Sequence, residues 1–439
     1  MSKPIKIKET QDRIITPGGL MLVGRLLKRT SLGRLLNRLG KPKGVKHQNA
    51  NCVISYVGVL CQGKTDYEDI REMQADPSFS CQALLINTIP SAETVRQRID
   101  DLALEIGSPS LIMEESASML KSVGLAPTPT FSGHVALDVD VSPHDNSNTK
   151  KEGVSRTYKG IDGYAPIYAY IGEEGYACNA ELRDGCCHSQ CEGTVEFLEE
   201  TLRLAKQTTE HKLLVRMDSG NDSMENIELF LKEDVDFLIK RNLRKETADE
   251  WLQIAQEHGV EYRPRDGKVI YTGEILRDKG FEKPLRIVFE VVSRTMLANG
   301  QVLIEPKVDI HTWWTSIENP VKDIIRLYHD HATCEQFHSE IKSDIGLERF
   351  PSGKYDTNAA ILKLALLAYN ILRIIGQSSL HYNDKLTRRN VKRLRAKTVI
   401  GRFMTIAGRV IEHARQTFFT LGRSNIWRDA FVKLYTAFG

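Results

Sequence analysis

The sequence has 439 residues, of which 41% are hydrophobic, and a formal net charge of +3. This length predicts two to four structural units, and the composition is that of a globular protein with a buried core. The N-terminus lacks a signal-peptide layout, which argues against a secreted protein. The most apolar stretch, residues 359–375, is interrupted by Lys363, Asn370 and Arg373. It is too short to span a bilayer comfortably, so we expect a buried core helix there.

Charge is unevenly distributed along the chain. No acidic residue occurs between Arg13 and Thr65, and Glu412 is the single acid in the Lys- and Arg-rich stretch from Lys385 to Arg423. This asymmetry indicates a polyanionic partner, either nucleic acid or a membrane surface, at both ends of the chain. The eight cysteines show no regular spacing, which favours free thiols in a reducing, cytoplasmic protein.

Residues 1–130 are predicted to form a helical DNA-binding region. Within it, residues 90–100 begin with Ser91, a good N-cap, and place Arg96, Gln97 and Arg98 on or near the exposed side of a helix. This pattern resembles the recognition helix of a helix-turn-helix. An ordinary amphipathic helix with a charged face remains the alternative.

Residues 131–245 predict several strands that carry carboxylates. The strand at 134–142 alternates, with Asp138 and Asp140 on the face opposite its valines. Two charges on one face of an apolar strand are costly unless they meet cations or water, although an exposed edge strand is the alternative. Two strands of an antiparallel meander follow. Asp218 ends a later buried strand, the position at which α/β folds place ligands.

A loop rich in cysteine lies between these strands. Cys186, Cys187, His188 and Cys191 suggest zinc, but the spacing contains no Cys-x2-Cys pair and no partner pair follows. We therefore expect a polar loop that leads into a helix at 194–204.

Residues 246–320 predict a β-rich insertion with strands at 269–276, 285–292 and 302–306. It ends near Trp313 and Trp314. Two adjacent tryptophans can stack on an unpaired base, whereas core packing is the alternative for either of them.

Residues 323–342 are predicted to form one helix of about six turns after Pro320. At about 100° per residue, Tyr328, His331, Glu335 and Lys342 share one stripe beside an apolar face. A solvated face with His331 paired to Glu335 would show the same pattern. The helix opens a segment at 321–380, and residues 381–439 are predicted to form a basic helical C-terminal region.

Three carboxylates, Asp140, Asp218 and Glu335, thus lie at two strand ends and on a helix. Carboxylates in such a set can hold two Mg²⁺ ions about 4 Å apart, for which Mn²⁺ can substitute. Such ions support in-line phosphoryl transfer.

The sequence resembles the DDE transposases of bacterial insertion sequences. The resemblance rests on Asp140-Val-Ser142, on Arg216-Met-Asp218-Ser-Gly, and on a Tyr-x2-Arg-x3-Glu-x6-Lys signature that reads Tyr328-x2-His331-x3-Glu335-x6-Lys342. His331 stands where the family usually has Arg, and Asp138 is the fallback for the first carboxylate. The resemblance implies an α/β fold with an RNase H-like mixed sheet flanked by helices, of which residues 131–245 and 321–380 are the two parts.

The resemblance implies cut-and-paste transposition. Metal-dependent nicking at the transposon ends would free a 3′-OH for strand transfer to target DNA, with a hairpin intermediate as one route. Asp140, Asp218 and Glu335 would hold the metals. Tyr328, His331 and Lys342 would position phosphates, and Trp313 or Trp314 would stack on a displaced base. Terminal repeats and the DNA backbone would be bound by Arg96, Gln97, Arg98, Arg388, Arg389, Lys392, Arg393 and Arg395.

The same resemblance implies a homodimer in the DNA complex and association with the bacterial nucleoid. Three alternatives remain open from the sequence. One is an inactive, transposase-derived DNA-binding protein, and another is a standalone RNase H-like nuclease. The third is a zinc hydrolase that uses His331, Glu335 and His338.

Overall fold

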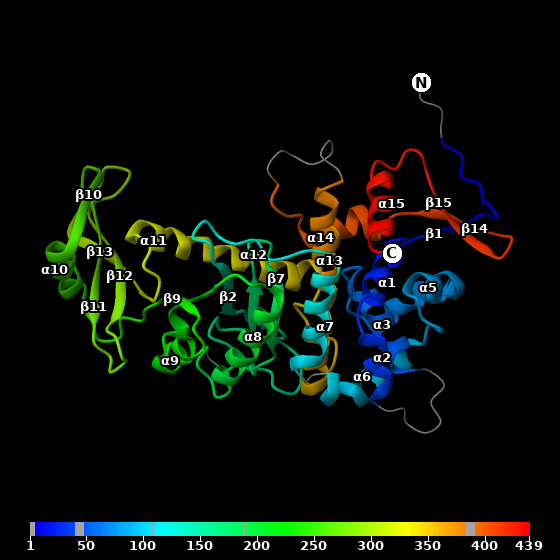
Figure 1. Ribbon diagram of the computed structural model, residues 1–439, viewed down its shortest axis with the longest axis horizontal. Helices are drawn as coiled ribbons and strands as arrows, with labels where there is room; N and C mark the ends of the chain where they lie inside the picture. Colours follow the sequence, from blue (N-terminus) through cyan, green and yellow to red (C-terminus); the bar gives the residue numbers. More distant parts are fainter. Residues whose placement is uncertain (1–4, 40–47, 107–108, 188, 383–390) are drawn as a thin grey trace. The chain divides into compact units, whose positions relative to one another are not determined.

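The computed structural model describes residues 5–39, 48–106, 109–187, 189–382 and 391–439 (Figure 1). The chain forms two compact units. The helical unit comprises Met1–Leu125, Glu340–Pro351 and Asp356–Gly439, and the sheet unit comprises Ala126–Ser339 and Ser352–Tyr355.

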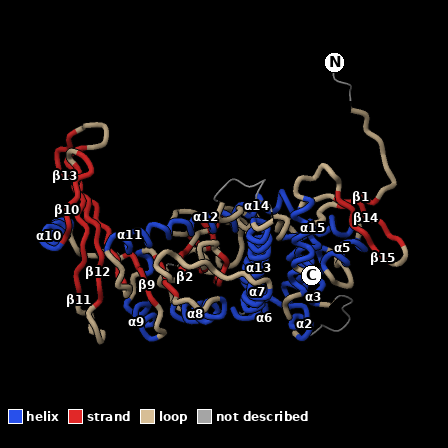
Figure 2. Tube along the Cα trace, turned by 45° about the horizontal axis from the view of Figure 1, so that its top comes forward, coloured by secondary structure: helices blue, strands red, loops and turns tan. Residues whose placement is uncertain are grey.

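The sheet unit is built on a nine-stranded sheet in the order β10-β11-β12-β13-β9-β8-β2-β6-β7. Figure 2 shows the strands in red and the helices in blue. Its central strands are parallel, because β2 pairs in parallel with β8 and β8 with β9, whereas β6 and β7 extend β2 as an antiparallel meander. Three antiparallel strands followed by two parallel ones form the sheet of an RNase H-like core, as expected. The five strands are β2 (Val135–Val141), β6 (Ile167–Ile171), β7 (Tyr176–Glu181), β8 (Leu213–Met217) and β9 (Asp236–Lys240).

Strand β2 lies between β6 and β8 and is buried at every position except Asp140, which is partly buried. The edge-strand alternative for Asp138 and Asp140 is therefore wrong. Helix α9 has a side-chain N-cap, because the Ser223 hydroxyl accepts a hydrogen bond from the Glu225 amide. The helices are α8 (Thr194–Thr208), α9 (Met224–Lys232), α10 (Ala248–His258), α11 (Val321–His329) and α12 (Cys334–Ser339), and a small separate sheet contains β3 (His144–Asp145), β5 (Asp162–Tyr164) and β4 (Ser155–Arg156).

The insertion is continuous with the core sheet. Its last strand, β13 (Val302–Thr315), pairs with β9 through Trp313, Trp314 and Thr315. The strands β10 (Gly259–Arg265), β11 (Lys268–Arg277) and β12 (Leu285–Met296) complete it. The insertion also contains α10, a helix that the sequence reading missed although Thr247 and Glu250 form a capping box at its start.

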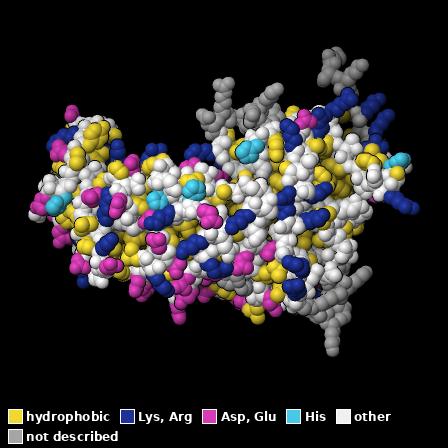
Figure 3. Space-filling model, in the orientation of Figure 1, with side chains coloured by type: hydrophobic (Ala, Val, Ile, Leu, Met, Phe, Trp, Pro, Cys, Tyr) yellow, Lys and Arg dark blue, Asp and Glu magenta, His cyan; other side chains and the backbone are white. Residues whose placement is uncertain are grey.

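The helical unit contains long and short helices beside a small sheet. In the view of Figure 3, many of its exposed side chains are Lys or Arg. Its helices are α1 (Leu20–Lys28), α2 (Leu32–Arg38), α3 (Asn49–Leu60), α4 (Arg71–Gln74), α5 (Pro77–Leu84), α6 (Ala92–Ile106), α7 (Pro109–Ser122), α13 (Tyr355–Leu380), α14 (Ala396–Val399) and α15 (Arg428–Ala437). The sheet has the order β1 (Arg13–Ile15), β14 (Gly408–His413) and β15 (Gln416–Leu421).

Helix α13 is the core of the helical unit. It is long and apolar enough to cross a membrane, but 94% of its apolar window is buried in the protein, so the predicted buried core helix is confirmed. From Asp356 onwards the helix belongs to the helical unit, not to the RNase H-like core in which the sequence reading placed residues 321–380. Asn370 illustrates the reason, since it donates to Ser116 of α7 at 2.8 Å.

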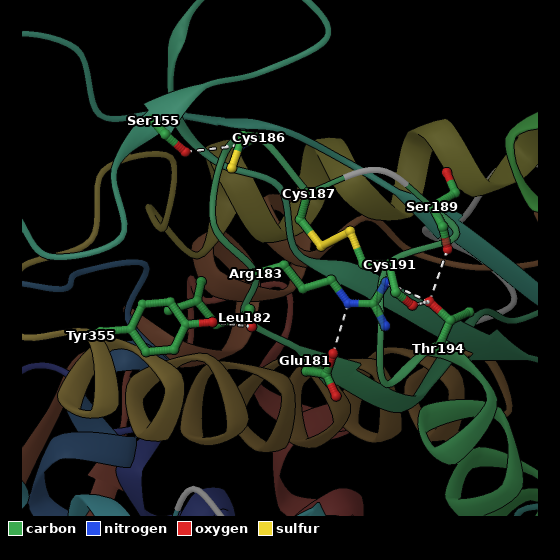
Figure 4. The surroundings of a disulfide bond; sticks show 10 residues. All are labelled: Ser155, Glu181, Leu182, Arg183, Cys186, Cys187, Ser189, Cys191, Thr194 and Tyr355. Carbon is green, nitrogen blue, oxygen red and sulfur yellow. Dashed lines mark hydrogen bonds and ion pairs between the residues drawn. A yellow bond between two sulfur atoms is a disulfide. The ribbon is translucent and has the colours of Figure 1, made fainter.

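The loop between β7 and α8 contains the residues considered for zinc. Cys187 and Cys191 form a disulfide there, with Cα atoms 5.9 Å apart (Figure 4). The expectation of free thiols is wrong for this pair, whereas Cys186 is free and exposed. The loop turns back because the Thr194 hydroxyl binds the Cys191 carbonyl at 2.8 Å. His188 lies outside the described residues. The disulfide removes two sulfurs from any zinc site, which agrees with a polar loop.

Candidate active site

Two of the predicted carboxylates follow neighbouring parallel strands. The register of β2 and β8 pairs Val139 with Met217, so Asp140 and Asp218 come next on each strand, at the same edge of the sheet. Burial and the negative charge of Asp140 raise the pKa of Asp218. The two carboxylates therefore repel each other electrostatically, and a cation bound between them would relieve that repulsion.

Asp218 is held in place by the turn that follows it. Its Oδ1 accepts hydrogen bonds from the Gly220 amide at 3.1 Å and from the Asn221 side chain at 2.8 Å. The 3-10 turn Ser219–Asn221 redirects the chain directly after the strand, so that the carboxylate lies at the end of β8.

Asp140 has a different set of partners. Its Oδ1 accepts from the Val141 amide at 2.8 Å, and its Oδ2 lies 3.3 Å from His338 Nε2. Burial raises the pKa of Asp140, but the hydrogen bond with His338 and the charges of His338 and His331 outweigh it and lower the pKa. One neighbouring carboxyl group is thus shifted towards the charged form and the other towards the neutral form.

The stretch with Glu335 is not one regular helix. Helix α11 gives way to a 3-10 turn at Asp330–Thr333, then to α12, and then to a π-helix at Glu340–Asp344. The prediction of a single six-turn helix at 323–342 is therefore wrong. Because the number of residues per turn changes along the segment, Tyr328, His331, Glu335 and Lys342 do not form the predicted stripe. Glu335 lies in the first turn of α12 and is exposed.

A compact group of potential ligands surrounds Asp140. Among the described residues, Asp140, Cys334 and His338 have ligand atoms that all lie within 4.8 Å of one another. Asp140, Asp218 and Glu335 do not form such a group in that part of the chain. Burial raises the pKa of the Cys334 thiol well above its usual value, and a neutral thiol is a poor metal ligand. His338 also lies 3.3 Å from the Tyr170 hydroxyl through Nδ1, so the group supports the Asp140 carboxylate.

Asp138 belongs to a buried ion pair. It is 2% exposed and accepts two hydrogen bonds from Arg216, at 2.6 and 2.7 Å, and one from His331 Nδ1 at 2.8 Å. Although burial raises its pKa, Arg216 and His331 outweigh that effect and lower the pKa to about 2. Because its oxygens are already used, Asp138 is a poor alternative to Asp140 as a metal ligand.

Comparison with protein families identifies the chain. The model of the transposase DDE domain group 1 family matches residues 1–438. The chain belongs to this family of DDE transposases. Such enzymes cleave DNA and transfer strands in reactions that depend on divalent metal ions, so the transposase binds DNA and catalyses transposition.

Other comparisons add little. No curated protein matches the transposase sequence. One solved structure to which it is similar is a cryo-electron-microscopy structure of the piggyBac transposase synaptic complex with hairpin DNA. The two sequences are 10% identical, the TM-score is 0.40, and the match covers 90% of this chain and 81% of the other. A likeness of this degree carries no argument about individual residues.

Several predicted DNA contacts of the transposase are buried. His331 is 7% exposed and is bound to Asp138, so a phosphate-gripping role is not compatible with its placement. Trp313 and Trp314 are 1% and 2% exposed, with Trp314 donating to Asp222 at 2.9 Å. They pack in the core because β13 is an interior strand, and neither offers a free ring face to a base.

Tyr328 remains beside the active site. Its ring is half-buried against Trp313, with centroids 5.4 Å apart, and burial together with the charges of Asp218 and Asp140 raises its pKa. Lys342 lies in the π-helix of the helical unit.

The predicted recognition helix of the transposase is α6. Its N-cap is confirmed, because the Ser91 hydroxyl accepts from the Thr94 amide at 3.2 Å. Arg98 is 4% exposed, which contradicts its expected exposed position, because the helix packs that side inwards. Arg96 is bound to Glu93 and Asp100, and Gln97 donates to Glu93.

The basic C-terminal cluster of the transposase is described in part. Arg388 and Arg389 lie outside the described residues. Lys392 is exposed, Arg393 is partly buried, and Arg395 pairs with Asp344 at 2.7 Å. This region is not wholly helical, because β14 and β15 form a hairpin within it.

Two residues beside Asp140 were not predicted from the sequence as part of the candidate site. Tyr158 is 58% exposed, and its hydroxyl donates to the carbonyl of Val141, next to Asp140, at 3.4 Å. Burial and the charges of Asp140 and Asp218 raise its pKa to about 12. The only sequence feature that pointed to Tyr158 was an aromatic residue before Lys159 and Gly160 in a polar loop. His338 was considered only as a zinc ligand, since its contact with Asp140 joins residues 198 positions apart.

Proposed function

We propose that this transposase excises a bacterial insertion sequence and joins it to target DNA, with Asp140, Asp218 and Glu335 as ligands of two Mg²⁺ ions. The observation that carries the proposal is the pair Asp140 and Asp218, at adjoining ends of two parallel strands, beside the helix that bears Glu335. We place the transposase in the subgroup with the Tyr-x2-Arg-x3-Glu-x6-Lys signature, here with His331 in place of Arg.

The residues present fit a hard divalent cation. Oxygen donors from carboxylates are the ligands that Mg²⁺ and Mn²⁺ prefer. Burial and the negative charge of Asp140 raise the pKa of Asp218, and a bound cation would favour the charged form of this carboxylate. When bound, the ions supply Lewis-acid activation of the attacking oxygen and stabilisation of the leaving 3′ oxygen.

The protein side chains position the DNA. Tyr328 lies beside the carboxylates, where a hydroxyl can contact the scissile phosphate. Tyr158 is the exposed aromatic next to Asp140, and it replaces the buried Trp313 and Trp314 as the residue that stacks on a displaced base of a hairpin. Lys342 contributes a phosphate contact.

The helical unit binds the terminal inverted repeats and the DNA backbone. Arg96 and Gln97 would exchange their contacts with Glu93 for DNA, which costs part of the binding energy. Backbone contacts come from Arg388, Arg389, Lys392, Arg393 and Arg395, and a phosphate-dominated interface predicts steep salt dependence. Two transposon ends are cut together, so a homodimer assembles on DNA.

The test uses a DNA fragment that carries the sequences flanking the coding region of the transposase. We expect Mg²⁺-dependent nicking at the element ends by the native chain, and nicking at the level of a protein-free control for Glu335→Gln and Asp218→Asn. Both variants are expected to retain DNA binding in Ca²⁺, because each changes a carboxylate to an amide of the same shape.

The alternatives give different results. A catalytically inactive DNA-binding protein would bind the ends without nicking by the native chain. A standalone RNase H-like nuclease would nick DNA without preference for the ends. Normal nicking by Glu335→Gln would exclude this active site.

A further inference from the structure

We propose that Asp138, Arg216 and His331 form a hub that sets the spacing of the three metal-binding carboxylates, with His331 acting as a positioning residue rather than a DNA contact. The hub is wholly within the sheet unit and joins three elements. Strand β2 supplies Asp138, strand β8 supplies Arg216, and the 3-10 turn before α12 supplies His331.

The contacts of the hub are short and buried. Arg216 donates through Nε and Nη2 to the two oxygens of Asp138, at 2.6 and 2.7 Å. The third nitrogen, Nη1, donates to the Leu327 carbonyl at 2.7 Å, near the end of α11. His331 Nδ1 donates to Asp138 Oδ1 at 2.8 Å. A bidentate pair fixes both the orientation of the Arg216 guanidinium and its distance from Asp138. The hub therefore holds β2, β8 and the end of α11 in one relative position.

Two hub residues share a strand face with the carboxylate that follows them, and the third lies just before the helix that bears Glu335. Asp138 and Arg216 lie two residues before Asp140 and Asp218, and alternate residues of a strand share a face. His331 lies in the 3-10 turn Asp330–Thr333, directly before α12, whose first turn contains Glu335. A shift of any hub contact would therefore move the carboxylate that follows it.

The hub also explains why His331 is buried. A residue that grips a DNA phosphate needs an exposed nitrogen, whereas His331 is 7% exposed and directs Nδ1 to a carboxylate. The inference rests on the proposed function, because it assigns to the hub the geometry of that same metal site. Partners that orient metal ligands in this way typically change metal affinity about 10- to 100-fold when they are removed.

The experiment measures Mn²⁺ binding to the full chain by isothermal titration calorimetry, with DNA affinity in Ca²⁺ measured in parallel. We expect His331→Ala to weaken Mn²⁺ binding by about tenfold or more while DNA affinity stays within twofold. His331→Asn places an amide nitrogen where Nδ1 was, so it is expected to restore binding, whereas His331→Gln places it too far out and is not.

A matched control is present in the same unit. His134 is bound to Asp236 at 3.0 Å and is partly buried, but it precedes β2 and so lies at the opposite end of the strands from Asp140. His134→Ala removes a His–Asp pair without touching the hub, and it is expected to leave Mn²⁺ affinity within twofold of the native value. Circular dichroism of each variant reports its folding, and the Asn and Gln pair decides the matter if His331→Ala does not fold.

The outcomes separate the hub from the proposed function. Native Mn²⁺ affinity in His331→Ala or in His331→Gln overturns the hub, as does an equal loss in His134→Ala. Weaker DNA binding with unchanged Mn²⁺ binding would restore the phosphate-contact role. Nicking by the native chain without measurable Mn²⁺ binding also overturns the hub, whereas the absence of both nicking and Mn²⁺ binding overturns the proposed function itself.

Discussion

Among single residues, the candidate active site contains two kinds of side chain: the carboxylates that we propose bind metal, and the side chains that contact and orient those carboxylates. Asp140 and Asp218 end their strands beside each other, and His338 supports Asp140 from α12. The aromatic side chains near the site differ in exposure. Tyr158 is exposed at the site, whereas Trp313 and Trp314 are core residues of β13.

The exposed ring of Tyr158 leads to a prediction about DNA binding. Tyr158→Ala is expected to weaken binding to an end with an unpaired terminal base by about 5- to 150-fold, since stacking contributes ~1–3 kcal/mol per base. Tyr158→Phe keeps the ring and should bind like the native chain. Fluorescence of 2-aminopurine at the unpaired position reports the stack, which the Ala variant would no longer quench.

Tyr262 provides the control for this experiment. It is 63% exposed on β10 of the insertion, so Tyr262→Ala removes a comparably exposed ring. Equal quenching and affinity in the native chain and Tyr158→Ala would contradict the stacking role.

At the scale of elements, polar residues buried in helices link segments that are distant in sequence. Arg373 of α13 donates to Glu340 at 2.9 Å and to the Leu394 carbonyl at 2.8 Å, and both charged side chains are almost fully buried. Glu340 also accepts from the Ala396 amide at the start of α14. One ion pair therefore ties α13, the π-helix and α14 together within the helical unit.

Removing one partner of that pair should be costly. Arg373→Ala is expected to reduce the free energy of unfolding by about 3–5 kcal/mol, because Glu340 would keep a buried charge without its partner. Urea unfolding followed by circular dichroism measures the change. Arg203→Ala on α8 breaks an exposed pair with Glu200 and should cost about 1 kcal/mol or less. A similar loss in both variants would mean that burial of the Arg373 pair contributes nothing.

At the scale of the whole molecule, the buried carboxylates make stability depend on pH. Burial opposes the charged form of Asp138, but Arg216 and His331 lower its pKa to about 2 from the usual 3.8. The folded state therefore binds this proton less tightly than the unfolded chain does. The resulting stability is fully present above about pH 4 and is lost as the pH falls through about 2.

This dependence can be measured on the native chain. A shift of this size corresponds to roughly 2 kcal/mol. The contribution of Asp138 to the free energy of unfolding should therefore be constant from pH 7 to about 5 and then decrease towards pH 2. Tryptophan fluorescence in urea titrations measures the change, since three of the four tryptophans, Trp251, Trp313 and Trp314, lie in the sheet unit. Asp138→Asn, which has no carboxyl group to titrate, should be less stable at pH 7 and should lose less on acidification. An unchanged acid dependence in that variant would contradict the assignment.

The candidate site was predictable where one local pattern determined the position of a residue. The alternation of β2 and the apolar run of β8 placed Asp140 and Asp218 at strand ends, and Pro320 marked the start of α11. Helix α10 was missed because its short apolar side was hidden among strands, although its capping box was visible in the sequence. The 3-10 turn around His331 was not predicted, and the contact of His331 with Asp138, 193 residues earlier, could not be read from local spacing.

Sequence patterns were enough to place Asp140 and Asp218 at strand ends and to suggest the transposase family, because both depend on local periodicity and residue spacing; the RNase H-like fold was implied by that resemblance. Only the folded structure distinguishes the exposed polar residues from the buried ones. His331 and Arg98 were expected on accessible faces, and the two tryptophans were open between base stacking and core packing, but all four side chains are buried. The same cause moved α13 into the helical unit, since burial is set by the partners that a segment meets and not by the segment alone.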